Sequence, residues 1–454
     1  MKKFYSLLIL LTLALSAPSA LAQQVVVVGY TYAGPLTGVT AYTTTDGQAA
    51  VHVGYQGVLE GADGWTVSTF GQYAVGLYAD QGGIISGTNM DVTTTNPGSH
   101  GVMVDSGQHY KSMVSLVSST IRTEGDNAFG LFVTAGGGGV SGSISGSGLY
   151  VHTIGSNSDG ICVNGADSVV DITNSEFVLE HATSALVRGW NKGTVTLTNV
   201  KADTIGSGLI LNGDAFYTGQ LITLNINESI LNGNLFTDNM AGVVNLAQGS
   251  TLTGKSTHSN HLTSGMTLNI ENGSRWKVKD DSTLTTLKNE GVLDLSETGA
   301  SLKISSIGSD LLANKGNFTQ TTDGTTLMAL SGNGPTSALI TADGMAFLAG
   351  TLDISMSNWD DAVGKTFTLV QWGGRIGTFE EFLLNGVDIW QAGTAWTFDD
   401  MLIDSWLVSG SVSYVGNTLT LTITDAVIPE PGVWALMLGG VGVLGYLQRR
   451  RNRK

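Results

Sequence analysis

The sequence predicts an all-β fold, a right-handed parallel β-helix, on three observations. The chain is rich in Gly, Thr, Ser and Asn, and only 13% of its residues are charged, which favours short strands and turns over helices. A short apolar strand with a small residue recurs every 23 to 30 residues. Two further strand patterns recur between its copies. A unit this short cannot bury its own apolar face, whereas units stacked in parallel share one continuous core.

The first element of the repeat is an apolar strand that starts at a small residue. The small residue of successive copies is Gly76, Gly101, Gly130, Gly160, Ala185 and Gly208. The uneven spacing indicates loops of different length. We expect this position at a corner of the coil, where a larger side chain would collide with the neighbouring turn.

Two other strand patterns complete the repeat. One ends in a polar turn and occurs at 120–125, 149–155 and 200–206. The other alternates apolar and polar residues, closes on a turn residue, and occurs at 169–175, 195–200, 224–229 and 268–273. Alternation predicts one buried face. At about 25 residues per turn and about 4.8 Å per stacked strand, some 300 residues would form about 12 turns.

Two other all-β folds are alternatives to the solenoid. A β-propeller or a β-sandwich also uses many short strands. Those folds favour hairpin turns, however, and two-residue Asn-Gly or Asp-Gly links between matched strands are few in this chain. The parallel β-helix is therefore the preferred prediction.

From about residue 330 the pattern changes to strands with concentrated aromatic residues. The tryptophans of this region are Trp359, Trp372, Trp390, Trp396 and Trp406. A solenoid needs a cover over its last open turn, and large apolar side chains suit that position. We therefore expect β-helix repeats over 23–329 and a C-terminal β cap over 330–425.

The first 22 residues are predicted to be a signal peptide. Lys2 and Lys3 precede an apolar run over 7–15, and Ala20 and Ala22 form the small-x-small pattern that signal peptidase accepts. An N-terminal membrane anchor is the alternative, but it needs roughly 20 apolar residues. We expect export, with signal peptidase cutting after Ala22.

The C-terminal segment, 426–454, is predicted to contain a short transmembrane helix at 432–447. This span has no charge and would reach roughly 24 Å at about 1.5 Å per residue. The basic tail at 448–454 should stay on the cytoplasmic side, which leaves the body of the chain outside the cytoplasm. The cationic residues of this basic stop are Arg449, Arg450, Arg451, Arg453 and Lys454.

The end of the chain resembles a known sorting signal. Pro429, Glu430 and Pro431, followed by the apolar span and the terminal arginine cluster, resemble the PEP-CTERM signal over about 27 residues. The resemblance implies a Gram-negative host that makes exopolysaccharide, and recognition by an exosortase, a membrane-embedded cysteine peptidase. It also implies anchoring in the inner membrane facing the periplasm, then release to the cell surface or beyond. A plain C-terminal anchor is the alternative.

The body of the chain resembles a second family, the passenger region of pertactin-type autotransporter adhesins. The resemblance lies at 272–276, 283–291 and 377–379, within about 170–425. It implies a parallel β-helix and a surface role. An autotransporter carries a membrane β-barrel after its passenger, whereas the sorting tail follows residue 425 here. We therefore expect no self-translocation.

The charge and the cysteine count exclude several classes of function. Residues 23–428 carry 36 of the 37 acidic residues and 14 of the 21 Lys and Arg, a formal charge of −22. Such an acidic surface opposes binding to nucleic acid or anionic lipid. The single cysteine, Cys162, excludes an intrachain disulfide. Its apolar surroundings predict a buried side chain rather than a nucleophile.

No set of residues in the sequence predicts catalysis, a metal or a cofactor. The acidic pairs at 280–281, 360–361 and 399–400 are expected in solvated turns, because adjacent strand residues point to opposite faces. His258 and His261 have metal-ligand spacing but lie in a polar connection, where a surface turn is expected. Galacturonase-like enzymes carry four short motifs, and only the Asn-x-Asp motif is present, at 89–91 and 212–214.

The sequence therefore predicts a non-enzymatic protein of the cell surface or extracellular matrix, associated with exopolysaccharide or a biofilm. Its expected partners are signal peptidase, an exosortase, the membrane through the C-terminal helix, and an extracellular polysaccharide. Two alternatives remain. One is a polysaccharide lyase or hydrolase on the same scaffold, and the other is an adhesin.

Overall fold

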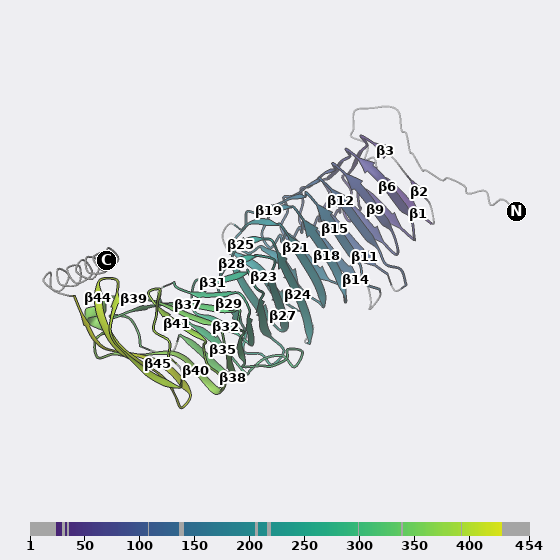
Figure 1. The fold of residues 1–454 in the computed structure, drawn as a ribbon. Coiled ribbons are helices and arrows are strands. Elements are labelled where there is room, and N and C mark those ends of the chain that lie inside the picture. The colour runs from purple at the N-terminus through teal and green to yellow at the C-terminus, as the bar shows by residue number, and fades with distance from the viewer. Residues whose placement is uncertain are drawn as a thin grey trace, which may run out of the picture.

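The computed structural model shows an elongated stack of short strands that ends in longer antiparallel strands (Figure 1). Among the described residues, no helix has the length and apolarity needed to cross a membrane. The predicted signal peptide with Ala20 and Ala22, the motif at 429–431, the span at 432–447 and the basic tail lie outside the described residues. The structure describes residues 24–428 apart from 30–31, 34–35, 108, 136–139, 205–207, 216–218, 298, 337–338 and 392.

The coil has three faces, and face A is a ten-stranded parallel sheet. Its strands are β1 (Val25–Val28), β5 (Val51–Gly54), β8 (Leu77–Asp80), β11 (Val102–Ser106), β14 (Leu131–Ala135), β17 (Ile161–Asn164), β20 (Ala185–Gly189), β23 (Leu209–Asp214), β26 (Asn234–Asp238) and β29 (Ser256–His258). Each strand pairs with the strand of the same kind in the next turn.

Face B is the longest ladder of parallel strands. It starts from two short strands, β2 and β3, which both pair with β6. Its strands are β2 (Tyr32–Ala33), β3 (Leu36–Thr37), β6 (Val58–Asp63), β9 (Ile84–Thr88), β12 (Met113–Val117), β15 (Ser143–Ser147), β18 (Ser168–Thr173), β21 (Gly193–Thr198), β24 (Gln220–Asn227), β27 (Met240–Ala247), β30 (Gly265–Ile270), β33 (Thr286–Asn289) and β36 (Phe318–Gln320).

Face C is built from two parallel sheets that meet where β22 contacts β25. The first contains β4 (Thr40–Thr43), β7 (Thr66–Thr69), β10 (Asp91–Thr94), β13 (Thr120–Thr123), β16 (Tyr150–Thr153), β19 (Glu176–Leu179) and β22 (Lys201–Thr204). The second contains β25 (Ile230–Asn232), β28 (Thr251–Gly254), β31 (Arg275–Val278), β34 (Val292–Leu295), β37 (Thr325–Ser331), β39 (Thr351–Ser357) and β41 (Glu381–Leu384).

The prediction of a parallel β-solenoid is confirmed, with about 13 turns. The three strand patterns of the sequence correspond to the three faces: the small-residue strand lies on face A, the alternating strand on face B and the strand before a polar turn on face C. One continuous apolar core runs from Val27 to Ala426. The right-handed winding stays a prediction that rests on the general preference of parallel connections.

The small residues form a column at the corner where the chain enters face A. A methyl group on Gly76 would lie 2.5 Å from both the Gly101 carbonyl oxygen and a methyl of Val92. The predicted collision with the neighbouring turn is therefore confirmed. The inward side chain of Val92, on face C, causes a second collision. Ala50 precedes Gly76 in the column, because Val51 pairs with Leu77.

Two residues that were predicted to belong to this column, Ala185 and Gly208, do not lie in it. Ile161 pairs with Val187, so the residue opposite Gly160 is Leu186 rather than Ala185. Gly208 likewise falls before its strand, where it adopts a positive φ of 58°. The column ends because Leu186 is fully buried and fills the interior there.

Buried serines join neighbouring turns at the corners. The Ser99 hydroxyl accepts a hydrogen bond from Ala74 N at 3.1 Å and donates to Gly71 O at 2.9 Å. The Ser158 hydroxyl likewise accepts a hydrogen bond from Ala128 N at 3.0 Å and donates one to Gly125 O at 2.7 Å. These hydroxyl groups satisfy buried main-chain groups that the strand ladders leave without partners. The sequence analysis did not identify this role.

The C-terminal region closes the coil with antiparallel strands. Parallel pairing continues past residue 330 as far as β41, so the strand pairing changes later than the boundary expected between 329 and 330. The remaining strands are β32 (Ser282–Leu284), β35 (Leu302–Ile304), β38 (Ile340–Leu348), β40 (Thr366–Gly377), β42 (Val387–Asp388), β43 (Ala395–Ile403), β44 (Trp406–Val415) and β45 (Thr418–Val427). Among these, β40 pairs with β45, β45 with β44, and β44 with β43, all antiparallel.

Large side chains pack at this C-terminal end of the coil. Trp359, Trp372 and Trp396 belong to the continuous core, whereas Trp390 is partly exposed. Trp359 begins the one helix of the described residues, α1 (Trp359–Ala362). This helix was not predicted from the sequence, because a four-residue helix leaves no apolar periodicity to detect.

Candidate functional site

The outward side of face A carries aromatic, acidic, basic and amide side chains. Most inward positions along its strands are apolar, with the buried residues Ser106, Thr237 and Ser256 as exceptions. Outward positions stack in columns from turn to turn, as strand alternation requires. The main outward column is His52, Tyr78, Met103, Phe132, Cys162, Arg188, Asn212, Phe236 and Thr257. A second column, two residues further along each strand, contains Asp80, Asp105, Thr134 and Asn164.

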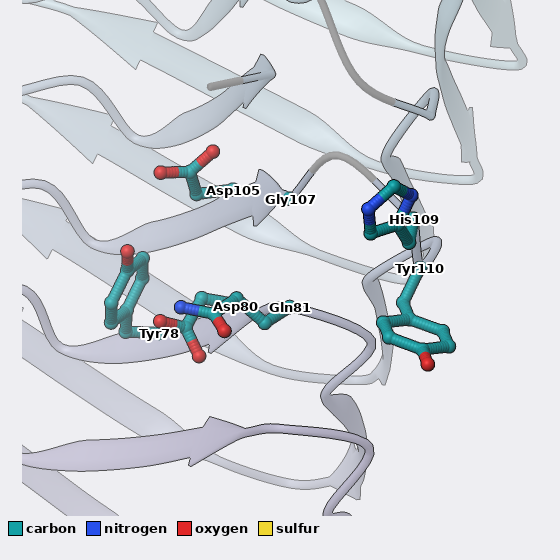
Figure 2. Close-up of a pocket in the computed structure, with 7 residues that line it drawn as sticks. All are labelled: Tyr78, Asp80, Gln81, Asp105, Gly107, His109 and Tyr110. Atoms are coloured by element: carbon teal, nitrogen blue, oxygen red, sulfur yellow. The ribbon is translucent and has the colours of Figure 1, made fainter. Parts of the chain in front are cut away.

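The first turns of this face are open and form a shallow pocket. Its volume is about 450 Å³. Figure 2 shows Tyr78 and Asp80 on one strand, Asp105 on the next, and His109 and Tyr110 on the connection to one side. The lining residues are Tyr78, Asp80, Gln81, Asp105, Gly107, His109 and Tyr110.

Hydrogen bonds and stacking order the side chains on the floor of the pocket. His52 Nε2 lies 3.0 Å from Asp80 Oδ1, and the His52 ring stacks on Tyr78 with a centroid distance of 5.1 Å. Burial raises the pKa of Tyr78 above its usual value, and the charges of Asp105 and Asp80 raise it further. The Tyr78 hydroxyl therefore stays protonated near the Asp105 carboxylate.

Tyr110 forms one wall of the pocket because Gly82 lets it approach. Gly82 has a φ of 88°, and a methyl group on it would lie 2.7 Å from Tyr110 Cβ. Ser112 anchors the connection, since its hydroxyl accepts from Gly82 N at 3.0 Å and donates to Asp105 O at 3.2 Å. The Tyr110 side chain itself is 47% exposed.

The middle turns of the same face are closed by an aromatic cluster on the outside of the coil. Phe129, Phe132 and Cys162 are buried there, with Met103 and Trp190 packed against them. His100 stacks on Phe129 at 4.9 Å between ring centroids, and burial lowers the pKa of His100 to about 4. An uncharged imidazole therefore packs as part of this cluster.

A buried ion pair follows the aromatic cluster along face A. Arg188 Nε donates to Asp159, and Arg188 Nη2 donates to Asp159 Oδ1 at 3.2 Å. Ala185 N donates to the same carboxylate at 2.7 Å. Burial raises the pKa of Asp159, and the guanidinium of Arg188 offsets part of that rise. This set of bonds satisfies the carboxylate internally, which is typical of a structural pair.

The Cys162 side chain is part of the packing of the fold. The thiol is fully buried, which confirms the sequence prediction, and burial raises its pKa well above the usual value. A protonated, covered thiol is a poor nucleophile. It lies in the outward column beneath the aromatic cluster rather than in the interior of the coil.

The acidic pairs noted in the sequence lie outside the strands of face A, whereas the two histidines lie at the end of its last strand, β29, and just after it. The acidic residues at 280–281, 360–361 and 399–400 are all exposed. The first pair lies between strands as predicted, but the second is in α1 and the third at an irregularity of β43, so the turn prediction was wrong for both. His258 ends β29, and His261 lies in the exposed turn after it. Within the described ranges, no group of three His, Cys, Asp or Glu could hold a metal ion.

Asp80 and Asp105 were not predicted from the sequence. They are direct partners on neighbouring turns, where strands lie about 4.8 Å apart. Separated by 25 residues in the chain, they leave no local motif. Placing them together required the register between β8 and β11, which the copies starting at Gly76 and Gly101 could have supplied.

Comparison with known proteins shows similarity to solved structures. The chain is similar to the crystal structure of the autotransporter UpaB from E. coli strain CFT073, with 14% identity over 89% of this chain and 96% of that chain, and a TM-score of 0.49. No family model and no curated protein matches the sequence. The resemblance of the C-terminal segment to the PEP-CTERM signal thus stays a prediction, and the fold assignment rests on the strand register of the chain itself.

Proposed function

We propose that this chain is an exported, non-enzymatic protein of the cell surface or extracellular matrix that serves as a rigid rod and binds polysaccharide. The observation that carries the proposal is the continuous core from Val27 to Ala426, closed by antiparallel strands at one end. A coil in which each turn pairs with the next resists bending and presents long outward faces. The acidic composition keeps such a rod soluble.

The terminal signals support the destination. In this proposal, signal peptidase removes residues 1–22, and the C-terminal helix holds the protein at the inner membrane facing the periplasm. An exosortase then recognises Pro429, Glu430 and Pro431 and releases the rod toward the exopolysaccharide layer. These steps rest on the sequence resemblance and on the charge of the basic tail.

Sorting is tested by replacing Pro429, Glu430 and Pro431 with Ala in the native host. Pro97→Ala, in an exposed turn of the coil, is the matched control. We expect the triple variant to stay in the membrane fraction at the unprocessed size, while the control behaves as the wild type. Unchanged size and location of the triple variant would reduce the tail to a plain anchor.

One observation favours a second candidate function, a polysaccharide hydrolase. Asp80 and Asp105 are carboxylates on neighbouring turns, the arrangement that acid–base cleavage of a glycosidic bond requires. Incubation of the purified protein with polysaccharides, followed by assay of new reducing ends, separates the two functions. Turnover that disappears in Asp80→Asn and Asp105→Asn would replace the non-enzymatic proposal.

A further inference from the structure

We propose that the pocket on the first turns of face A is a binding subsite for a neutral, hydroxyl-rich glycan rather than an acidic one. The inference rests on the proposed function, because it names the place on the rod where polysaccharide binds and the chemical class of the sugar. Three features of the pocket carry it: aromatic rings, a lining of hydrogen-bond acceptors, and two carboxylates with no Lys or Arg among the described lining residues.

The aromatic rings supply flat apolar surfaces at the edge of a polar site. Tyr110 is 47% exposed at the wall, and Tyr78 is held on the floor by stacking against His52. Aromatic side chains with a polar tip suit ligands that are apolar on one side and hydrated on the other, as sugar rings are. At about 450 Å³, the pocket is in the range of sites that bind small organic groups.

The polar lining matches hydroxyl donors. Asp80 and Asp105 contribute carboxylates, and Gln81 contributes an amide that can both donate and accept. An ionised carboxylate accepts hydrogen bonds only, and these charge-assisted bonds are stronger than those between neutral groups. The Tyr78 hydroxyl lies near Asp105, whose negative charge helps to keep that hydroxyl protonated. A ring of sugar hydroxyl groups would find acceptors on neighbouring turns.

The charge of the pocket excludes acidic sugars. None of the seven described residues that line it is Lys or Arg, and two are Asp. A uronate or a sulfated sugar would bring its negative charge against Asp80 and Asp105 with no cation in the lining to pair with it. The charge of −22 on residues 23–428 adds to this repulsion at long range. Neutral sugars avoid both penalties.

A further exposed aromatic residue indicates how the glycan chain runs. Gln56 N donates to Gln81 O at 3.1 Å, so this connection lies one turn before the pocket. Tyr55 directly precedes Gln56 and is 57% exposed. The connections that carry Tyr55, Gln81 and Tyr110 therefore succeed one another along the coil. The glycan should extend along the long axis, with Tyr55 contributing less than Tyr110.

The test measures binding of full-length protein, purified in detergent, to neutral polymers (dextran, laminarin and galactomannan) and to acidic ones (alginate and polygalacturonate). The variants are Tyr110→Ala and Asp105→Asn. The controls are Tyr73→Ala, an exposed tyrosine at another corner of the coil, and Asp91→Asn, an exposed aspartate on face C. Because Tyr110 is exposed, its variant keeps the test valid even if Asp105→Asn fails to fold.

We expect binding to at least one neutral polymer, a loss of tenfold or more in affinity for both pocket variants, and wild-type affinity for both controls. Wild-type affinity in Tyr110→Ala, or preference for an acidic polymer, would overturn the inference and leave the proposed surface role standing. Binding to none of the five polymers would overturn both the inference and the polysaccharide-binding part of the proposed function.

Discussion

Face A is open over its first turns and closed over its middle turns, although the same column of outward positions runs through both. At Tyr78 the column lines an open pocket, whereas Phe132 and Cys162 are only 7% and 0% exposed. The open part pairs a tyrosine with carboxylates, and the closed part packs aromatic rings over an internal ion pair. The comparison shows that strand register decides which side chains lie outward, while the side chains of neighbouring turns decide whether that surface stays available for a ligand.

The largest expected effect on stability comes from breaking the buried ion pair in the closed part of face A. Arg188→Met leaves Asp159 as a buried carboxylate without its charged partner, which should lower the free energy of unfolding by about 3–5 kcal/mol. Arg122→Met is the control, because the Arg122–Glu124 pair is largely exposed and should be worth less than about 1 kcal/mol. Urea unfolding measures both. Equal losses would contradict the assignment of the Arg188 pair as a buried structural pair.

The next largest effect is a dependence of stability on pH, which arises in the same closed part of face A. The folded-state pKa of His100 is about 4, below its usual value of 6.5, so the unfolded chain takes up the proton first as the pH falls. Stability from this group is therefore complete above pH 6.5 and is lost between pH 6.5 and 4, by about 3 kcal/mol at most.

Replacing His100 with Gln should remove that part of the pH dependence. The measurement is the unfolding midpoint at intervals from pH 7 to 4 for the wild type, His100→Gln and the control His261→Gln, a histidine in an exposed turn. The control should keep the wild-type profile. An unaltered profile in His100→Gln would mean that another group causes the loss.

A smaller effect is expected at the corner that supports both parts of the face. A methyl group on Gly101 would lie 2.4 Å from an Ile121 methyl and 2.9 Å from Gly130 O. Gly101→Ala should therefore cost about 1–3 kcal/mol through overpacking. Gly334→Ala, in a connection where the nearest contact would be 3.1 Å, is the control for thermal unfolding. A Gly101→Ala midpoint equal to that of the control would show that the corner can widen.

The smallest effect on stability should come from the open part. Tyr110→Ala removes a half-exposed ring and should change the free energy of unfolding by less than about 0.5 kcal/mol. Phe132→Ala, in the closed part, should cost about 3–5 kcal/mol. Thermal unfolding of the two variants sharpens the comparison directly. A large loss in Tyr110→Ala would identify this residue as part of the packing rather than as a free binding surface.

Much of the coil could be predicted because each strand carries a local pattern. The alternation in 169–175 and 224–229 correctly predicted strands with one buried face, now β18 and β24. The small residues up to Gly160 predicted the corner column, since only a residue without a large side chain fits there. Prediction failed at Ala185 and Gly208, because the length of the connections varies and sequence spacing alone does not determine register.

The candidate site was beyond the reach of local patterns. Asp80 and Asp105 are ordinary outward residues of two different strands, and Tyr110 lies in a connection without a motif. Their proximity depends on hydrogen bonds between β8 and β11 and on the close approach of Tyr110 to Gly82. The acidic pairs that were visible in the sequence, such as 280–281, are instead exposed away from this face.

The sequence by itself determined the class of strand, the repeat of three patterns, the acidic charge and the absence of a disulfide, because these depend on composition and on neighbours along the chain. The tertiary structure alone decided which outward residues meet and which are covered. The physical reason is that partners on adjacent turns are separated by a full turn of chain, so a shift of one residue in the ladder of hydrogen bonds changes every contact.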